Sequence, residues 1–397
     1  MTRHVPDFTN HLPVRIDFGP GSLERLGEAV TYEGCQAPFV IADPVVLVLP
    51  AIQQLLAHLV SLGLRVSIAE VPVGEPTLAT VDALGDQLRR AHADGRADVM
   101  IALGGGSALD TAKGARLLLT NPGSIRRYIW PGEPQPISAP FVPLITVPTT
   151  AGTGSEVTGG VVMTDPDSGL KVAAPSPHNR AQYCFVDPRL TLALPPGPTL
   201  WGGIDALGQA IGATLSSVHT PVGDGLGLEA VRLISRALPT VIAHPLDLDA
   251  RTDMAAAALL AGLAMNVSEA GSEHSLAHPL GSLHHLPHGL TVALMLAESM
   301  EHDRRYVPAR LERVADALGE PPLRPGEAPD GSRAVRAVQR LLAELGCPTL
   351  RDCGVTEDDV EPLTEAALAG WIPVEPGPWT REDIAHAYRR ALSLTTR

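Results

Sequence analysis

Histidine is concentrated in one short segment of this chain. Of the 14 histidines in 397 residues, five fall within 15 residues: His274, His278, His284, His285 and His288. His274 and His278 lie four apart, on one face of a helix, and His288 follows a Leu-Pro turn at the start of the next helix. Imidazole is the commonest metal ligand among side chains. The spacing therefore predicts a metal site or a catalytic cluster; the alternative is a set of solvated or core histidines.

A divalent ion normally also needs an oxygen ligand, and Asp205 is the candidate. A carboxylate in the otherwise apolar start of a helix requires a partner. Gln209 lies one turn further along, and its carbonyl oxygen could face the same ion. The alternative for this pair is an exposed first turn, in which Asp205 complements the helix dipole.

Two other segments have the composition of nucleotide-binding loops. The first joins an apolar strand to a helix and comprises Gly104, Gly105, Gly106 and Ser107, followed by Asp110 in the helix. Glycines let the backbone approach a pyrophosphate, which the helix N-terminus holds. The second, residues 148–156, follows another apolar strand and contains Thr149 and Thr150. Open α/β sheets bind ligands at such strand ends; a plain turn and a solvated loop are the alternatives.

Asp43 follows the apolar run 38–42. A carboxylate at the end of that strand can accept hydrogen bonds from the hydroxyls of an adenosine ribose and disfavours a 2′-phosphate. It therefore favours NAD over NADP. The alternative role is a helix N-cap.

The elements that must position these residues follow from hydrophobic periodicity. Through about Asp187, short apolar runs alternate with helical segments, which is the pattern of βαβ units in a parallel sheet. The expected strands cover residues 38–42, 65–71, 99–103 and 143–147. The expected helices between them cover residues 51–62, 80–92 and 108–119.

The periodicity becomes helical after Leu194-Pro195-Pro196-Gly197-Pro198, a run that predicts a boundary because successive prolines cannot lie inside a helix. We therefore expect an N-terminal Rossmann-like α/β domain that binds NAD(P), residues 1–196, and an all-α helical-bundle domain that binds the metal, residues 197–397. The helices expected in the second domain cover 204–216, 224–237, 251–266, 288–302, 308–318, 332–345, 357–369 and 381–394.

Composition limits the class of protein. The chain has 44 acidic and 30 basic residues, for a formal charge of −14, which opposes extended contact with nucleic acid. Its longest apolar runs fall short of the ~18–20 residues that span a bilayer. Its four cysteines lack Cys-x-x-Cys spacing, and its start has no signal-peptide pattern. These features predict a cytoplasmic protein with a small-molecule partner, without nucleic acid or membrane.

Several motifs together resemble the iron-dependent (group III) alcohol dehydrogenases over nearly the whole chain. They are Phe18-Gly19-Pro20-Gly21, Gly104–Ser107 with Asp110 and Lys113, Pro148–Glu156, Val186-Asp187-Pro188, Gly203–Leu207 and His274–Gly289. The resemblance implies the dehydroquinate synthase-like fold and an NAD(P)H cofactor. It also implies bound Fe2+, with Zn2+ as the alternative ion, and a homodimer.

The resemblance also implies roles for individual residues. The metal ligands would be Asp205, His274 and His288, and His278 would lie beside the substrate and relay the proton. Cofactor contacts would fall on Gly104, Gly105, Gly106, Ser107, Thr149 and Thr150, with Asp43 near the ribose and Lys171 near the active cleft.

One position departs from the family pattern. The family's first histidine ligand sits one turn after the aspartate, and Gln209 occupies that position here. An amide oxygen is a weaker donor than imidazole, so we expect iron to bind less tightly, through Gln209 or a water, or to be lost.

The expected function is metal-dependent, NAD(P)H-linked reduction of a small aldehyde to a primary alcohol. His284, His285 and Lys171 could make the pocket cationic enough for an anionic aldehyde. A faint resemblance to the branch that reduces phosphonoacetaldehyde to 2-hydroxyethylphosphonate points the same way. The alternatives are a general short-chain alcohol dehydrogenase, a maleylacetate reductase-like enzyme, which would tolerate a lost metal, and a non-catalytic NAD-binding protein.

Overall fold

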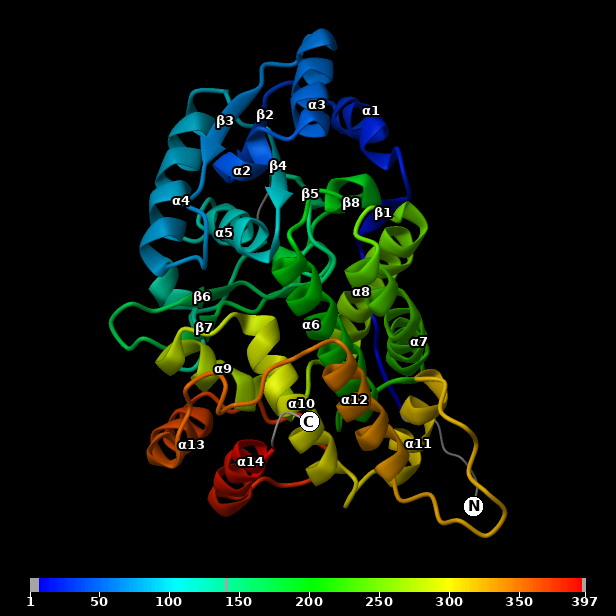
Figure 1. Ribbon diagram of the computed structural model, residues 1–397. Coiled ribbons are helices and arrows are strands. Elements are labelled where there is room, and N and C mark those ends of the chain that lie inside the picture. The colour runs from blue at the N-terminus through cyan, green and yellow to red at the C-terminus, as the bar shows by residue number, and fades with distance from the viewer. Residues whose placement is uncertain (1–6, 140–141, 395–397) are drawn as a thin grey trace. The chain divides into compact units, whose positions relative to one another are not determined.

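The computed structural model describes residues 7–139 and 142–394 (Figure 1). Within them the chain divides into two compact units, Leu12–Leu194 and a second one from Pro195 onward. The expected boundary, after residue 196, lies two residues further along. The described residues before Leu12, residues 7–11, group with the second unit, and the sheet of the first unit begins at Arg15.

The first unit is built on a six-stranded sheet in which every pair of neighbouring strands is parallel. The strands are β1 (Arg15–Phe18), β2 (Pro38–Ala42), β3 (Ser67–Glu70), β4 (Val99–Gly104), β5 (Leu144–Pro148) and β8 (Tyr183–Val186). A separate antiparallel hairpin joins β6 (Val162–Thr164) to β7 (Lys171–Ala173). The predicted parallel α/β architecture is confirmed.

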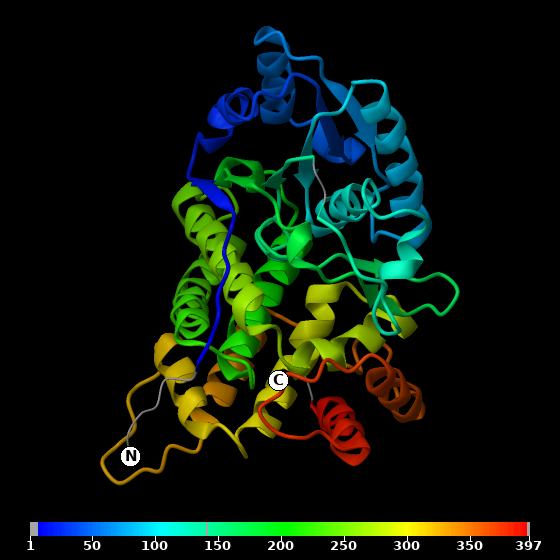
Figure 2. The ribbon, with the colours of Figure 1, turned by 180° about the vertical axis from the view of Figure 1, so that it is seen from behind.

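Helices cover both faces of this sheet, as the front and back views show (Figures 1 and 2). They are α1 (Leu26–Tyr32), α2 (Pro44–Leu47) and α3 (Pro50–Ser61) on one face, and α4 (Leu78–Ala93) and α5 (Gly106–Leu117) on the other. Side chains of a strand point alternately to the two faces. Val40 and Ala42 of β2 accordingly join the core beneath α1–α3, whereas Phe39 and Ile41 join the core beneath α4 and α5.

The strand order, β1-β8-β5-β4-β2-β3, reverses beside β4. From β2 the chain continues to β3 on one side, and it then returns to place β4 on the other side of β2. Open α/β sheets bind ligands outside the carboxyl ends of the strands at such a switch point. The loops that follow β2, β4 and β5 therefore meet where a ligand site is expected.

The second unit is helical, as predicted. Its helices are α6 (Pro196–Leu215), α7 (Pro221–Ala243), α8 (Leu248–Ser268), α9 (Ser272–His284), α10 (His288–Asp303), α11 (Pro308–Ala317), α12 (Ser332–Glu344), α13 (Val360–Ala369) and α14 (Arg381–Ser393).

Helix α6 begins eight residues earlier than the expected 204. Pro195 is its extended N-cap and Pro196 its first helical residue, where the missing N–H would have had no partner. The proline run thus starts a helix instead of preceding one. Asp205 consequently lies in the middle of α6 and is 3% exposed, so the alternative of an exposed first turn is wrong.

Helices α8 and α9 meet at a bend of 108°, and Glu269 in the connection has a positive φ of 60°. The bend lets α9 pack against both α6 and α10. Among the described helices, none is by itself long and apolar enough to cross a membrane; only the bent pair α8 and α9 would pass on length and composition.

Candidate functional site

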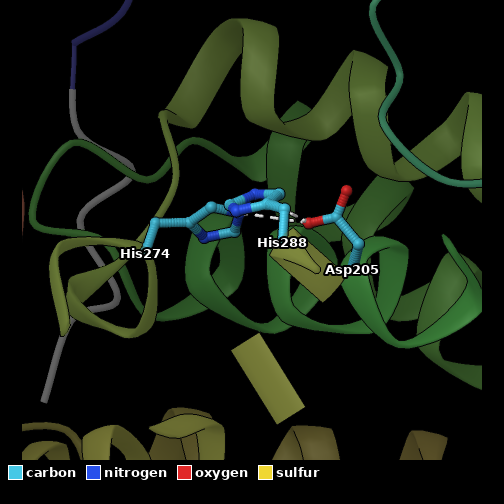
Figure 3. A group of neighbouring side chains, drawn as sticks. All are labelled: Asp205, His274 and His288. Atoms are coloured by element: carbon cyan, nitrogen blue, oxygen red, sulfur yellow. Dashed lines mark ion pairs between the residues drawn. The ribbon is translucent and has the colours of Figure 1, made fainter. Parts of the chain in front are cut away.

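Three ligand atoms from three helices converge in the helical unit. Asp205 comes from α6, His274 from α9, and His288 is the first residue of α10. The Nε2 atoms of both histidines lie 3.4 Å from Oδ1 of Asp205. Figure 3 marks these two ion pairs with dashed lines. The three donor atoms lie within 4.8 Å of one another, and they form the one such group of His, Cys, Asp and Glu side chains among the residues described.

Close backbone contact between α6 and α10 brings two of these residues together. Gly289, next to His288, faces the carbonyl oxygen of Trp201 so closely that a Cβ there would overlap it. Gly208 lies about one helical turn after Asp205, and a Cβ there would lie 2.6 Å from Val292 of α10. Both helices can therefore approach only because these positions carry no side chain.

Glu273, which sequence reasoning missed, holds the ring of His274. Its Oε1 lies 2.8 Å from Nδ1 of His274 and also accepts the backbone N–H of Gly271 at 2.9 Å. The signal that could have found it is the one used for Asp205: an acid in an apolar helical segment needs a partner.

Gln209 lies one turn from Asp205, as expected, and the two side chains are in contact. Its Nε2 donates to Oδ2 of Asp205 at 3.1 Å. The structure therefore directs the amide nitrogen of Gln209 at the carboxylate. That its carbonyl oxygen faces an ion stays a prediction. Oδ1 of Asp205 is left facing the two imidazoles without a hydrogen bond of its own.

Burial and charge act in opposite directions on this group. Burial lowers the pKa of His274, but the negative charge of Asp205 and Glu273, both in contact with its ring, outweighs burial and raises that pKa to about 10. Burial raises the pKa of Asp205, but His288, His274 and Gln209 outweigh it and hold the pKa below its ordinary value. The group thus attracts positive charge strongly, and a metal ion would compete with protons for it.

His278 lies beside the group but is not part of it. Its ring centroid is 6.3 Å from that of His274 and 5.6 Å from that of His288. His278 and His288 are partly exposed, whereas His274 and Asp205 are buried, so the group is accessible from one side. His284 and His285 lie at the end of α9; His284 is 3.6 Å from Asp359, and His285 has a positive φ of 55°.

The chemistry of these donors fits a divalent transition metal. One carboxylate and two imidazoles on one ion, with an accessible side, is the ligand number of a catalytic site that keeps positions for water and substrate. The buried Oδ1 of Asp205, which makes no hydrogen bond, is the atom that a cation would satisfy. Mixed nitrogen and oxygen ligands suit Fe2+ and Zn2+ alike.

In the α/β unit the two predicted loops lie side by side. The Thr149 N–H donates to the carbonyl oxygen of Gly104 at 2.9 Å. A Cβ on Gly105 would lie 3.1 Å from Thr150, and one on Gly106 would lie 2.8 Å from Thr153. Gly105 caps α5, so the N–H groups of Gly106 and Ser107 are in the first turn of that helix, where an anion is favoured.

Asp43 is the N-cap of α2 and accepts the N–H of Val46 at 2.9 Å. The alternative role predicted for Asp43, a helix N-cap, is thus present. It does not exclude a second role as acceptor for the ribose hydroxyls. The other carboxylate oxygen, Oδ2, lies 3.9 Å from the Cβ position of Gly104, whose φ of +148° requires glycine. Asp43 therefore sits across the switch point from the glycine loop.

Asp110 lies beneath the loops instead of at their surface. Its Oδ1 is bonded to Ser155 Oγ at 2.5 Å and to Lys113 Nζ at 2.8 Å, and its Oδ2 accepts the Val162 N–H. Buried Lys113 also donates to the carbonyl oxygens of Ser155 and Gly160. Asp110 and Lys113 thereby connect α5 to the loop after β5.

Lys171, the last predicted cofactor contact, begins β7 and forms an ion pair with Glu75. Glu75 also accepts from Thr164 of the partner strand β6. The structure places Lys171 in the hairpin and gives it a carboxylate partner, and its contact with a cofactor stays a prediction.

Comparison with known proteins covers both units. Residues 13–188 match the family model "Iron-containing alcohol dehydrogenase", and residues 199–392 match "Fe-containing alcohol dehydrogenase family, C-terminal". Long-chain-alcohol dehydrogenase 1 of Geobacillus thermodenitrificans is 34% identical over 380 residues, which are 95% of each chain.

Solved structures agree with these matches. A 1,3-propanediol oxidoreductase aligns with a TM-score of 0.90 at 31% identity, covering 97% of this chain and 100% of the other. Sulfoacetaldehyde reductase from Bifidobacterium kashiwanohense, solved in complex with NAD+, aligns with a TM-score of 0.87 at 27% identity, covering 98% and 100%. The chain belongs to the iron-containing alcohol dehydrogenase family and is an oxidoreductase of that type.

Proposed function

We propose that the protein transfers hydride reversibly between a nicotinamide cofactor and a small aldehyde or its primary alcohol. The observation that carries this proposal is the convergence of Asp205 Oδ1 and the Nε2 atoms of His274 and His288 within 4.8 Å, in a chain of this family. The α/β unit would hold the cofactor, and the helical unit would hold the metal and the carbonyl group.

Asp205, His274 and His288 would hold the metal, with Gln209 as a fourth ligand if its amide turns to present oxygen. Fe2+ is the expected ion, and Zn2+ would fit the same donors. When bound, the ion supplies Lewis acidity that polarises a carbonyl and stabilises developing alkoxide charge.

The residues around the group would handle the substrate and the proton. Asp205 and His274 are buried, so the carbonyl would enter from the side of His288 and His278. His278 is the residue we assign to proton transfer, because its imidazole lies beside His288 and is partly exposed.

The cofactor would be held at the switch point of the sheet. The first turn of α5, with Gly104, Gly105, Gly106 and Ser107, would take the pyrophosphate, and Thr149 and Thr150 would line it. Asp43 would accept from the ribose and favour NADH over NADPH. Asp110 would act through Ser155 by fixing the loop, and Lys171 would contribute from the hairpin.

For the substrate we propose an anionic small aldehyde, with phosphonoacetaldehyde as the specific candidate and 2-hydroxyethylphosphonate as its product. Two observations support this choice. His284 ends α9, 3.6 Å from Asp359 between Nε2 and Oδ1, and His285 follows it, so these imidazoles could contribute positive charge toward an anion. One structural relative is a sulfoacetaldehyde reductase, named for a sulfonate analogue of such a compound.

The test is metal analysis of the purified protein together with an aldehyde panel and both NADH and NADPH. Turnover of phosphonoacetaldehyde well above that of succinic semialdehyde and butanal would support the anionic substrate, whereas a preference for butanal would indicate a general short-chain alcohol dehydrogenase. Chelation is expected to abolish activity. Chelator-resistant reduction of maleylacetate would contradict the metal-dependent function, and cofactor binding without turnover on any carbonyl would make the protein a non-catalytic NAD binder.

A further inference from the structure

Glu273 is a buried carboxylate whose only ion-pair partner, within the described residues, is His274. It is 2% exposed, and Asp205, which contacts the same histidine, is 3% exposed. Ionised carboxylates in an apolar interior require compensating positive charge and hydrogen bonds. No lysine or arginine in the described chain forms an ion pair with either residue, so imidazoles are the positively charged groups paired with them, and the acidic Asp303 lies near Glu273 as well.

The contacts of Glu273 fix the proton on one nitrogen of His274. An ionised carboxylate only accepts hydrogen bonds, so the Nδ1 atom 2.8 Å away must donate. In a neutral imidazole the lone pair is then on Nε2, the atom 3.4 Å from Asp205 Oδ1. The second bond to Oε1, from the Gly271 N–H, holds the carboxylate at the first turn of α9.

The surface of α6 is shaped to accept this carboxylate. Gly208 and Gly212 lie one helical turn apart. A Cβ on Gly212 would overlap Oε1 of Glu273, and one on Gly208 would lie 3.6 Å from Glu273 Cγ and 3.9 Å from His274 Cε1. The glutamate and the histidine thus occupy space that side chains on α6 would fill.

Asp205 is held in a parallel way. Gln209 donates to Oδ2 of Asp205, which leaves Oδ1 directed at the imidazoles. Each of the two buried ligands therefore has its second polar atom engaged by a neighbouring side chain, and a single donor atom left for an ion.

We propose that Glu273 is a positioning residue of the metal centre, which holds Nδ1–H of His274 and supplies the second buried negative charge that a divalent cation balances. The inference rests on the proposed function, because it takes Asp205, His274 and His288 as the metal ligands. With Asp205 and Glu273 both ionised, a divalent ion makes the buried group neutral. Without the charge of Glu273, the ion would leave net positive charge in the interior and would bind less tightly.

Glu273→Gln tests this directly because it keeps the size of the side chain and removes its charge. We expect metal affinity, measured by competition with a chelator, to fall about 10- to 100-fold, which is the usual effect of losing such a partner. The visible absorption spectrum of the Co2+-loaded protein should change. Thermal stability of the metal-free protein should fall, because His274 loses one of the two carboxylates that balance its positive charge.

Glu298→Gln is the matched control, since Glu298 is also buried, at 4% exposure, on a helix of the same unit, and pairs with Arg390 instead of a histidine. It should leave metal affinity and the Co2+ spectrum unchanged. Glu273→Asp, which keeps the charge at shorter reach, should recover part of the affinity.

Wild-type affinity and spectrum in Glu273→Gln would overturn the proposal while leaving the proposed function intact. A wild-type protein that reduces aldehydes without holding metal would instead overturn the metal-dependent function. If Glu273→Gln does not fold, a metal-loaded structure of the unchanged protein decides, because ligation through Nδ1 of His274 contradicts the proposal and ligation through Nε2 supports it.

Discussion

Helix α10 has imidazoles and carboxylates at both of its ends, and the two ends differ. At its start, His288 meets Asp205 of α6 and His274 of α9. At its last turn, His302 lies against its own neighbour Asp303, with 3.6 Å between Nδ1 and Oδ1. His302 also stacks on Trp379, with ring centroids 3.8 Å apart. Both ends bring a histidine and an aspartate together, and only the first brings in a third ligand.

The difference lies in where the donor atoms come from. Three separate helices supply the first group, and their side chains point to a common centre. In the second group the imidazole face is covered by an indole ring, and both ring nitrogens of His302 are buried without a hydrogen bond. Burial of a histidine beside an aspartate is thus insufficient for a metal site, which needs convergent donors with the other polar atoms engaged.

The charges of the two groups differ as well. Negative charge from Asp205 and Glu273 raises the pKa of His274 to about 10 despite burial. At the other end burial dominates and raises the pKa of Asp303 to about 6, although His302 opposes the shift. The first group is therefore arranged to hold positive charge, and the second favours a neutral carboxyl group.

Replacing one aspartate ligand should produce the largest contrast between the two ends. Asp205→Asn removes the charge shared by both imidazoles, so the protein should lose its metal. Activity should fall roughly 10³-fold or more, since a metal supplies several kcal/mol of transition-state stabilisation. Metal analysis and steady-state kinetics measure both effects.

His302→Asn is the control at the other end of α10 and should retain metal and activity. Metal loss in His302→Asn, or full metal content in Asp205→Asn, would contradict the assignment of the two ends.

A methyl group at the start of α10 should break the first group without touching a ligand. In Gly289→Ala the new Cβ would overlap the Trp201 carbonyl, so α10 must move away from α6 and separate His288 from Asp205. We expect weaker metal binding and a loss of stability of about 1–3 kcal/mol, typical of overpacking. Gly225→Ala on α7, where nothing lies within 4 Å of the new Cβ, should leave metal binding unchanged. Equal metal affinity in the two variants would show that the contact between Gly289 and the Trp201 carbonyl does not determine metal binding.

The smallest expected effect is a change of pH dependence at the second group. The pKa of Asp303 is about 6 in the folded protein and about 4 in the unfolded chain. The contribution of the protonated Asp303 to the free energy of unfolding is therefore complete below pH ~4 and is lost as the pH rises through 6. Asp303→Asn should therefore gain roughly 1–2 kcal/mol of stability at pH 7 and none near pH 4. Urea unfolding of the metal-free protein at several pH values measures this, and a variant less stable at pH 7 would contradict it.

Buried strands were predictable from sequence because they are continuous apolar runs. Residues 38–42 and 99–103 correspond to β2 and β4. The outer strand β1 was not predicted, since Arg15 and Asp17 interrupt any apolar run and only its pairing with β8 makes it a strand. Helix α6 was placed too late because its first turn contains prolines and glycine, which indicate a turn unless tertiary packing continues the helix.

The sequence indicated the side chains that could bind a metal, but not the neighbouring side chains that hold them in place. Asp205, His274 and His288 lie together, whereas Glu273 was overlooked because a single acid beside a histidine has no distinctive spacing. Asp110 was expected at the cofactor, and its burial beneath the loop depends on Ser155 and Val162, which are far from it in sequence.

The glycines on α6 have a consequence for how this centre can change over time. Gly208, Gln209 and Gly212 lie within about one turn of the same helix. A side chain at either glycine would displace Val292 of α10 or Glu273, whereas a substitution at position 209 changes only the group that contacts Asp205. Substitutions that alter the preferred metal are therefore tolerated best at position 209. The two glycines, which have no functional group, are the positions where substitution would disturb the packing of the centre most.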